Sequence, residues 1–137
     1  LLRLMEKNQK QIMKVLKDMG YIPEIDADGD ICIYLEMKHF YFFVAETEDT
    51  KYVNLVLPQF APIEEGQEVL ALATCNLITR DMKIVKTYIE RTHDSISASC
   101  EFIYTDEESL KQNITTCLEV MRVIKTLYRR KYKELSK

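Results

Sequence analysis

Three aspartates at alternate positions, Asp26, Asp28 and Asp30, could bind a calcium ion through their carboxylates. In an EF-hand loop whose invariant glycine is Gly29, the twelfth position would carry a glutamate, but Leu35 stands there. A strand pattern also follows where that motif requires a helix. The spacing therefore favours a tight turn in which Asp and Gly tolerate unusual backbone angles, and we predict no metal and no cofactor.

The two histidines, His39 and His93, are the obvious candidates for a general base. His93 precedes Asp94, but a catalytic triad also needs a separate nucleophile directed at the imidazole. Serines alternate along one predicted strand, a pattern that a solvated or helix-contacting strand face explains better: Ser95, Ser97 and Ser99. We therefore predict no catalytic residue and classify the chain as a non-enzyme.

Four cysteines are spread along the chain without the close pair that a zinc site usually needs: Cys32, Cys75, Cys100 and Cys117. Each lies within an apolar strand or helix pattern. This distribution is typical of reduced thiols that serve as small hydrophobic side chains, and it favours a cytoplasmic location.

A basic cluster with Arg129 and Arg130 near the C-terminal end is interleaved with Tyr128 and Tyr132. It could contact phosphate, an acidic peptide or an anionic membrane surface, or it could be a solvated helix end whose cations complement the helix dipole. Net charge is −3, because residues 21–120 carry −12 between basic terminal segments. Nucleic-acid-binding domains are usually net positive, so we predict no nucleic acid. No run approaches the ~18 apolar residues that span a bilayer, so we predict no stable membrane insertion.

Apolar spacing predicts the elements that must position these side chains. Helical spacing over 4–19, ended by Gly20, predicts a first helix. Three runs predict an antiparallel meander whose second strand is buried on both faces: 31–38, 40–45 and 51–57, the last ended by Pro58. Further patterns predict a helix, two strands and one long amphipathic helix: 67–80, 82–90, 95–104, and Asp106 almost to Lys137.

The predicted fold class is α+β, in the order α-β-β-β-α-β-β-α, with one largely antiparallel five-stranded sheet packed by helices. We expect residues 1–137 to form a single domain. Since large bare apolar patches are rare on monomers, a twin subunit or a client segment should cover the second sheet face. We predict a partner-binding surface containing Tyr34, Phe42, Tyr52, Arg129 and Arg130.

Several short motifs are spread over nearly the whole chain: the Met19-Gly20-Tyr21 helix end before the Asp28-Gly29-Asp30 turn, the strand Tyr41-Phe42-Phe43-Val44, and the helix Ala73-Thr74-Cys75-Asn76-Leu77 leading into Lys83-Ile84-Val85-Lys86. Together they resemble YbjN-type proteins of the type III secretion chaperone-like fold. The family often has a second Asn-like position on that helix, and here Thr79 stands where it would be.

This resemblance implies helices against one antiparallel sheet, and chains commonly paired as dimers. It links YbjN proteins to stress or regulatory roles and the secretion chaperones to the binding of unfolded effector segments. We therefore expect a non-enzymatic protein-interaction module, chaperone-like or regulatory, that forms a homodimer and binds a protein or peptide client. Two alternatives stay open: a small-ligand-binding or enzymatic domain with a pocket between sheet and helices, and nucleic-acid binding through the basic last helix.

Overall fold

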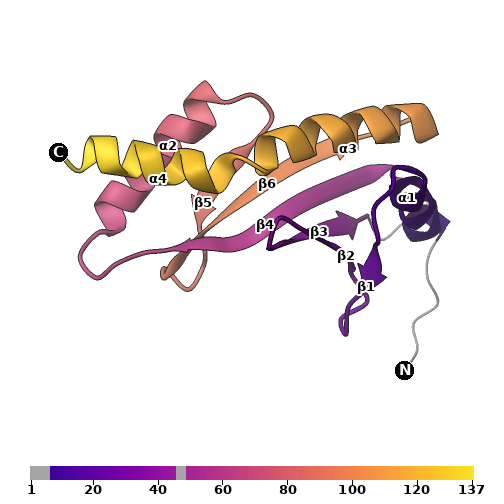
Figure 1. Ribbon diagram of the computed structural model, residues 1–137, viewed down its shortest axis with the longest axis horizontal. Coiled ribbons are helices and arrows are strands. Elements are labelled where there is room, and N and C mark those ends of the chain that lie inside the picture. Colours follow the sequence, from indigo (N-terminus) through magenta and orange to yellow (C-terminus); the bar gives the residue numbers. More distant parts are fainter. Residues whose placement is uncertain (1–6, 46–48) are drawn as a thin grey trace. The chain divides into compact units, whose positions relative to one another are not determined.

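The computed structural model describes residues 7–45 and 49–137 and has an α+β architecture. Its strands form one sheet in the order β1-β2-β3-β4-β6-β5 (Figure 1). The strands are β1 (Glu24–Ile25), β2 (Ile31–Leu35), β3 (Lys38–Val44), β4 (Tyr52–Pro62), β5 (Lys86–Ile89) and β6 (Ser95–Ile103). The helices are α1 (Lys7–Asp18), α2 (Glu68–Asp81), α3 (Glu107–Met121) and α4 (Ile124–Leu135). The predicted fold class and order of elements are thereby confirmed in outline.

Three details of the sequence prediction need correction. The sheet has six strands, because the short strand β1 pairs with β2 through Ile25 and Ile31. The third predicted strand does not end at Pro58, because β4 continues to Pro62. The last helix is interrupted, since α3 ends at Met121 and α4 starts at Ile124. The buried apolar side chains continue at helical spacing across this interruption, so the pattern gave no sign of it.

The chain divides into two compact units. Unit 1 comprises residues 1–56 and 101–116, and unit 2 comprises residues 57–100 and 117–137. The single domain predicted over residues 1–137 stays a prediction.

The core of unit 1 lies on one face of its strands, called the inner face below. Register pairs Ile31 with Phe42 and Phe42 with Leu55, so these side chains share that face. The side chains buried in this core come from β2, β3, β4, α1 and α3: Ile31, Ile33, Phe40, Phe42, Val53, Leu55, Ile12, Val15, Leu16, Leu110 and Ile114. Helix α1 is tied to the neighbouring loops by two side-chain amides, because Asn8 donates to the carbonyl of Thr50 and Gln9 to that of Gly29.

The buried side chains of unit 2 come from β4, β5, β6, α2, α3 and α4. Phe60 meets Tyr128 edge to face, with ring centroids 5.6 Å apart. Thr87 on β5 donates from Oγ1 to the carbonyl of Cys75 and from its backbone N–H to Thr79 Oγ1, both at 2.9 Å. These bonds fix β5 to α2.

The serine row of β6 is buried, and not solvated as one interpretation of the sequence had it. Ser97 is fully buried, donates to Glu90 Oε1 at 2.6 Å and accepts from the backbone N–H of Gln59 at 2.8 Å. Gln59 has a φ of +48°, a left-handed conformation that is uncommon outside glycine. Ser97 therefore satisfies the backbone of an irregular position in β4.

Replacing Ser97 by alanine is expected to lower the free energy of unfolding by about 1–3 kcal/mol, because it removes two part-buried hydrogen bonds, one to the Glu90 carboxylate and one from the Gln59 backbone. Ser99 provides the matched control. Its Oγ is buried and has no hydrogen-bond partner among the described residues, so Ser99→Ala should be nearly neutral or slightly stabilising. Urea denaturation followed by circular dichroism measures both variants. Equal losses would show that the bonds of Ser97 do not matter.

Candidate partner-binding site

The second face of the unit 1 strands carries a group of aromatic side chains. Register pairs Tyr34 with His39 and Phe43 with Asn54, positions that alternate with the inner-face residues. We define the aromatic face as Tyr34, His39, Tyr41, Phe43 and Tyr52. It draws on β2, β3 and β4, adjacent strands of the sheet (Figure 1).

Solvent reaches much of this aromatic face. Tyr34 is 62% exposed and Phe43 is 38% exposed, while Tyr41 and Tyr52 are half-buried. The rings are mutually supported, since Tyr34 lies 4.7 Å from His39 and Tyr41 stacks on Phe43 at 6.1 Å, measured between centroids. Contacts of this kind hold the rings in place before a partner arrives, which reduces the entropy lost on binding.

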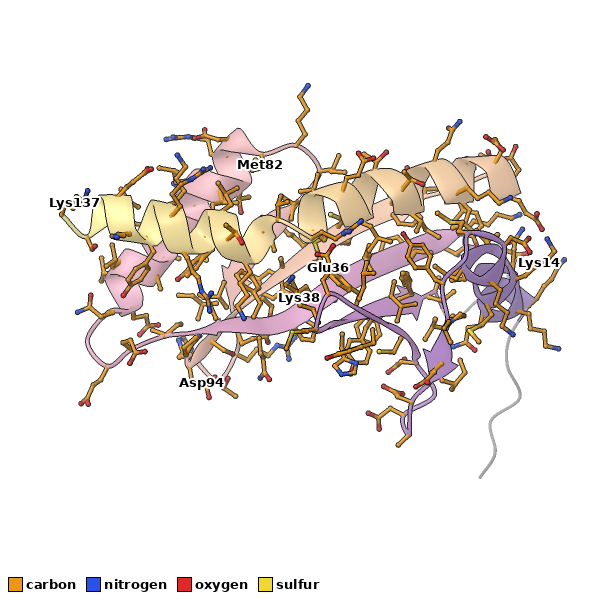
Figure 2. All side chains as sticks on the ribbon, in the orientation of Figure 1. Lys14, Glu36, Lys38, Met82, Asp94 and Lys137 are labelled. Atoms are coloured by element: carbon orange, nitrogen blue, oxygen red, sulfur yellow. The ribbon has the colours of Figure 1, made fainter. Side chains whose placement is uncertain are left out.

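An exposed methionine adjoins this surface at the β2–β3 turn. Glu36 and Met37 form the turn with φ of 52° and 65°, and Met37 is 86% exposed. A two-residue hairpin with both φ values positive normally carries Asn-Gly, so this turn is strained by its sequence. Lys38 Nζ lies 4.0 Å from Glu36 Oε2 beside it (Figure 2). The strained turn presents a flexible apolar side chain to solvent at the end of the β2–β3 hairpin.

Tyr52 connects the aromatic face to β6 by donating a hydrogen bond to the Glu101 carboxylate. This bond, more than partial burial, raises the pKa of Tyr52 to about 12 from an ordinary value of 10. The raised pKa means that the bond is intact below pH 10 and is lost as the pH rises through about 12.

Replacing Glu101 by glutamine is expected to return the pKa of Tyr52 towards 10, because the carboxylate no longer opposes phenolate formation. Phenolate absorbance followed against pH measures the change, and Tyr52→Phe identifies which part of the titration belongs to Tyr52. Superimposable titrations of the Glu101→Gln variant and the parent chain would contradict the assigned bond.

A cysteine–histidine pair, which the sequence reasoning missed, lies at the edge of the aromatic face. Cys32 Sγ lies 3.5 Å from His39 Nδ1 across β2 and β3. Nucleophilic catalysis by cysteine needs a lowered thiol pKa, but burial raises the pKa of Cys32 and outweighs a hydrogen bond from Tyr41 that lowers it. The thiol form is therefore favoured, which is the opposite of an activated nucleophile.

The structure places the predicted site residues in different environments. Tyr34 and Tyr52 lie on the aromatic face, whereas Phe42 lies on the inner face with 1% of its surface exposed and is corrected to a core residue. The reason is that β3 alternates, with Phe40 and Phe42 buried and Phe43 exposed, and is not buried on both faces as predicted. Arg129 and Arg130 are exposed on α4 in unit 2. Partner binding by Tyr34, Tyr52, Arg129 and Arg130 stays a prediction.

The aspartates and the second histidine considered in the sequence make contacts with nearby groups of the fold. Asp26 Oδ1 accepts from the backbone N–H groups of Asp28 and Asp30, both at 2.9 Å, which supports the interpretation as a turn. The carboxylates of these three aspartates lie within 4.8 Å of one another. His93 Nδ1 lies 2.8 Å from Glu68 Oε1, with both side chains exposed on unit 2.

Among the described helices, none has the length and apolar character to cross a bilayer.

No family model matches this chain, and no curated protein sequence matches it. Solved structures do resemble it. YbjN from E. coli superposes with a TM-score of 0.62 at 9% identity, over 87% of each chain. A chain of the HopA1–SchA chaperone–effector complex superposes with a TM-score of 0.54 at 12% identity, over 88% of this chain and 96% of the other. The chain therefore has the YbjN-type, secretion chaperone-like fold that its sequence motifs predicted.

Proposed function

We propose that this chain is a non-enzymatic protein-interaction module, chaperone-like or regulatory, that binds a polypeptide segment on the aromatic face. The observation that carries the proposal is the exposure of ordered aromatic rings, led by Tyr34 and Phe43, on the sheet face opposite the core. Tyrosine and phenylalanine are enriched at protein interfaces, where they supply large contact area at low entropic cost.

The similar structures support this proposal by analogy. One belongs to a chaperone–effector complex, in which a chaperone binds another protein. The other is described as a proposed transcription regulator. Each description concerns that protein, and the fold alone is shared, so the argument for this chain depends on the aromatic face itself.

A peptide array tests polypeptide binding directly. The full chain is applied to segments that vary in aromatic, aliphatic and charged content, and the best binder is then labelled with fluorescein for anisotropy titration. We expect preference for segments with apolar side chains at alternate positions, since a sheet face presents rows of side chains at that period. Failure to retain any segment above background would refute the proposal.

We further propose that the chain forms a homodimer in the cytoplasm. The four free cysteines, three of them buried, suit a reducing compartment. Light scattering during gel filtration measures the mass, which should be about twice the 16.1 kDa of one chain. A mass equal to that of one chain at high protein concentration would refute the dimer.

We also propose that Arg129 and Arg130 assist partner binding. Both are exposed on α4, where guanidinium groups can pair with carboxylates of a client. The array-selected peptide is titrated against the variant with Arg129→Gln and Arg130→Gln. Unchanged affinity would refute a role of the two arginines in peptide binding.

A further inference from the structure

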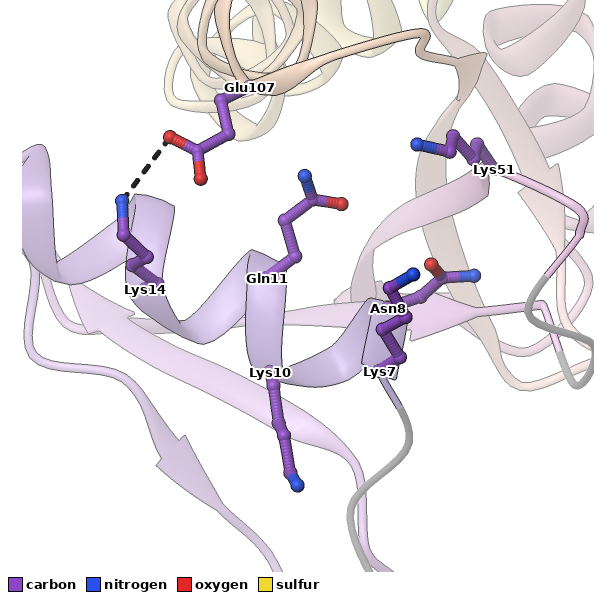
Figure 3. A pocket seen from close by; sticks show the side chains of 7 residues that line it. All are labelled: Lys7, Asn8, Lys10, Gln11, Lys14, Lys51 and Glu107. Atoms are coloured by element: carbon purple, nitrogen blue, oxygen red, sulfur yellow. Dashed lines mark hydrogen bonds and ion pairs between the residues drawn. The ribbon is translucent and has the colours of Figure 1, made fainter.

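The exposed side of α1 in unit 1 carries lysines at helical spacing next to two surface hollows. The first hollow, of about 310 Å³, is lined by α1 together with Lys51 from before β4 and Glu107 from the start of α3 (Figure 3). The second, of about 400 Å³, is lined by Lys10, Met13, Lys14, Lys17 and Asp18. The two hollows share Lys10 and Lys14, and together they are called the α1 groove.

The charges in the α1 groove are unbalanced. Five lysines line it against two carboxylates, which belong to Asp18 and Glu107. Both carboxylates are engaged by one lysine, because Lys14 Nζ lies 2.9 Å from Asp18 Oδ2 and 3.2 Å from Glu107 Oε2. Lys7, Lys10 and Lys17 form no ion pair with any other described residue. The groove therefore has positive charge that the described part of the chain does not neutralise.

The position of Glu107 is set by the start of α3. Asp106 Oδ1 accepts from the backbone N–H of Ser109 at 2.8 Å, and Ser109 Oγ accepts from that of Asp106 at 3.1 Å. This reciprocal cap fixes the first turn of the helix. Glu107 holds Lys14 at one side of the first hollow, Lys51 stands at the other, and the Gln11 amide points into the space between them (Figure 3).

We propose that the α1 groove binds an acidic polypeptide segment, whose carboxylates pair with the lysines while an apolar side chain contacts Met13. The inference rests on the proposed polypeptide binding and places a second, charge-selective contact on unit 1. The Gln11 amide can donate to and accept from a peptide backbone, and each hollow has room for a few side chains.

Charge favours a peptide over the two other polyanions that lysines bind. A nucleic-acid backbone presents a continuous row of phosphates, which the Asp18 and Glu107 carboxylates would repel, and the chain is net negative. Binding to an anionic membrane favours a protruding surface of basic and apolar side chains. The lysines of the α1 groove instead line two hollows. A peptide can place its carboxylates at separate lysines and keep polar side chains beside the two acids.

The test uses the full chain and a fluorescein-labelled glutamate-rich peptide that contains leucine, beside the same peptide with glutamine for glutamate. Anisotropy at physiological ionic strength should show clearly tighter binding of the glutamate peptide. The variant Lys7→Gln, Lys10→Gln, Lys17→Gln should bind it about tenfold more weakly, since each exposed ion pair contributes roughly 0.5 kcal/mol. Circular dichroism checks that the variant is folded.

A matched variant removes three exposed lysines of unit 2 by Lys83→Gln, Lys133→Gln and Lys137→Gln, and it should keep wild-type affinity. Equal binding of the two peptides, or an equal loss in the matched variant, would overturn the inference. So would binding of duplex DNA or phosphatidylserine vesicles through the α1 lysines with no binding of the glutamate peptide. A chain that binds the array-selected peptide but not the glutamate peptide would overturn this inference alone, and binding of neither would overturn both proposals.

Discussion

Replacing Phe42 by alanine is expected to lower the free energy of unfolding by about 3–5 kcal/mol. Phe42 is 1% exposed and lies between Ile31 on β2 and Leu55 on β4, its register partners in the core of unit 1. Truncation removes most of a ring from a closely packed interior and leaves a cavity that the adjacent strands can fill only in part. Small domains are stable by roughly 5–15 kcal/mol, so the loss is a large share of the total.

The adjacent Phe43 serves as the control for Phe42. It is the same residue type on the same strand, but it is 38% exposed and faces the other side of the sheet. Phe43→Ala should cost about 1 kcal/mol or less, because it opens no enclosed cavity and loses mainly the contact with Tyr41. Urea denaturation monitored by circular dichroism compares the two variants. Similar midpoints would mean that β3 is not oriented as described.

The variant Tyr34→Ala, Phe43→Ala is expected to weaken binding of the array-selected peptide by at least about 30-fold. Central aromatic side chains of an interface typically cost 2 kcal/mol or more when truncated, which corresponds to that ratio. Tyr34 is the most exposed tyrosine of the aromatic face, and Phe43 is its phenylalanine. Neither contributes to the core of unit 1. The anisotropy titration described for the wild type measures the loss.

Exposed apolar side chains on unit 2 control for non-specific hydrophobic binding. Val69 and Leu72 on α2 are 82% and 58% exposed and belong to unit 2, whereas the aromatic face belongs to unit 1. Val69→Ala with Leu72→Ala should leave the peptide affinity within about twofold, in keeping with the small effects of most surface substitutions. If this variant loses as much affinity as the first, binding does not depend on the aromatic rings.

Sequence patterns predicted those elements whose side chains alternate visibly or recur at helical spacing. The alternating sequence of β2 predicts one buried and one solvent-exposed face. In the structure Ile31 and Ile33 are buried and Tyr34 is exposed. β3 has an aromatic or β-branched residue at nearly every position, so its composition could not show which face each ring occupies. Only pairing with β2, which joins Phe42 to Ile31, assigns Phe42 to the core and Phe43 to the surface.

The α1 groove illustrates a second reason why site prediction from sequence was incomplete. The lysines of α1 recur at helical spacing in the sequence, but a helix face by itself is not a hollow. Lys51 and Glu107, which complete the first hollow, come from distant parts of the sequence. Their approach depends on tertiary packing, which propensity and periodicity do not encode.

The backbone irregularity at Gln59 lies directly before a buried aromatic ring of β4. In an uninterrupted strand, side chains two apart share a face, so Phe60 would point to the same side as Pro58. The left-handed φ at Gln59 interrupts this regular geometry, and the Phe60 ring that follows is buried and meets Tyr128 edge to face. Gln59 is itself exposed and makes no contribution to the core through its side chain. The side chain at position 59 is therefore replaceable, but a proline there is not, because it would remove the N–H that donates to Ser97 and cannot adopt a positive φ.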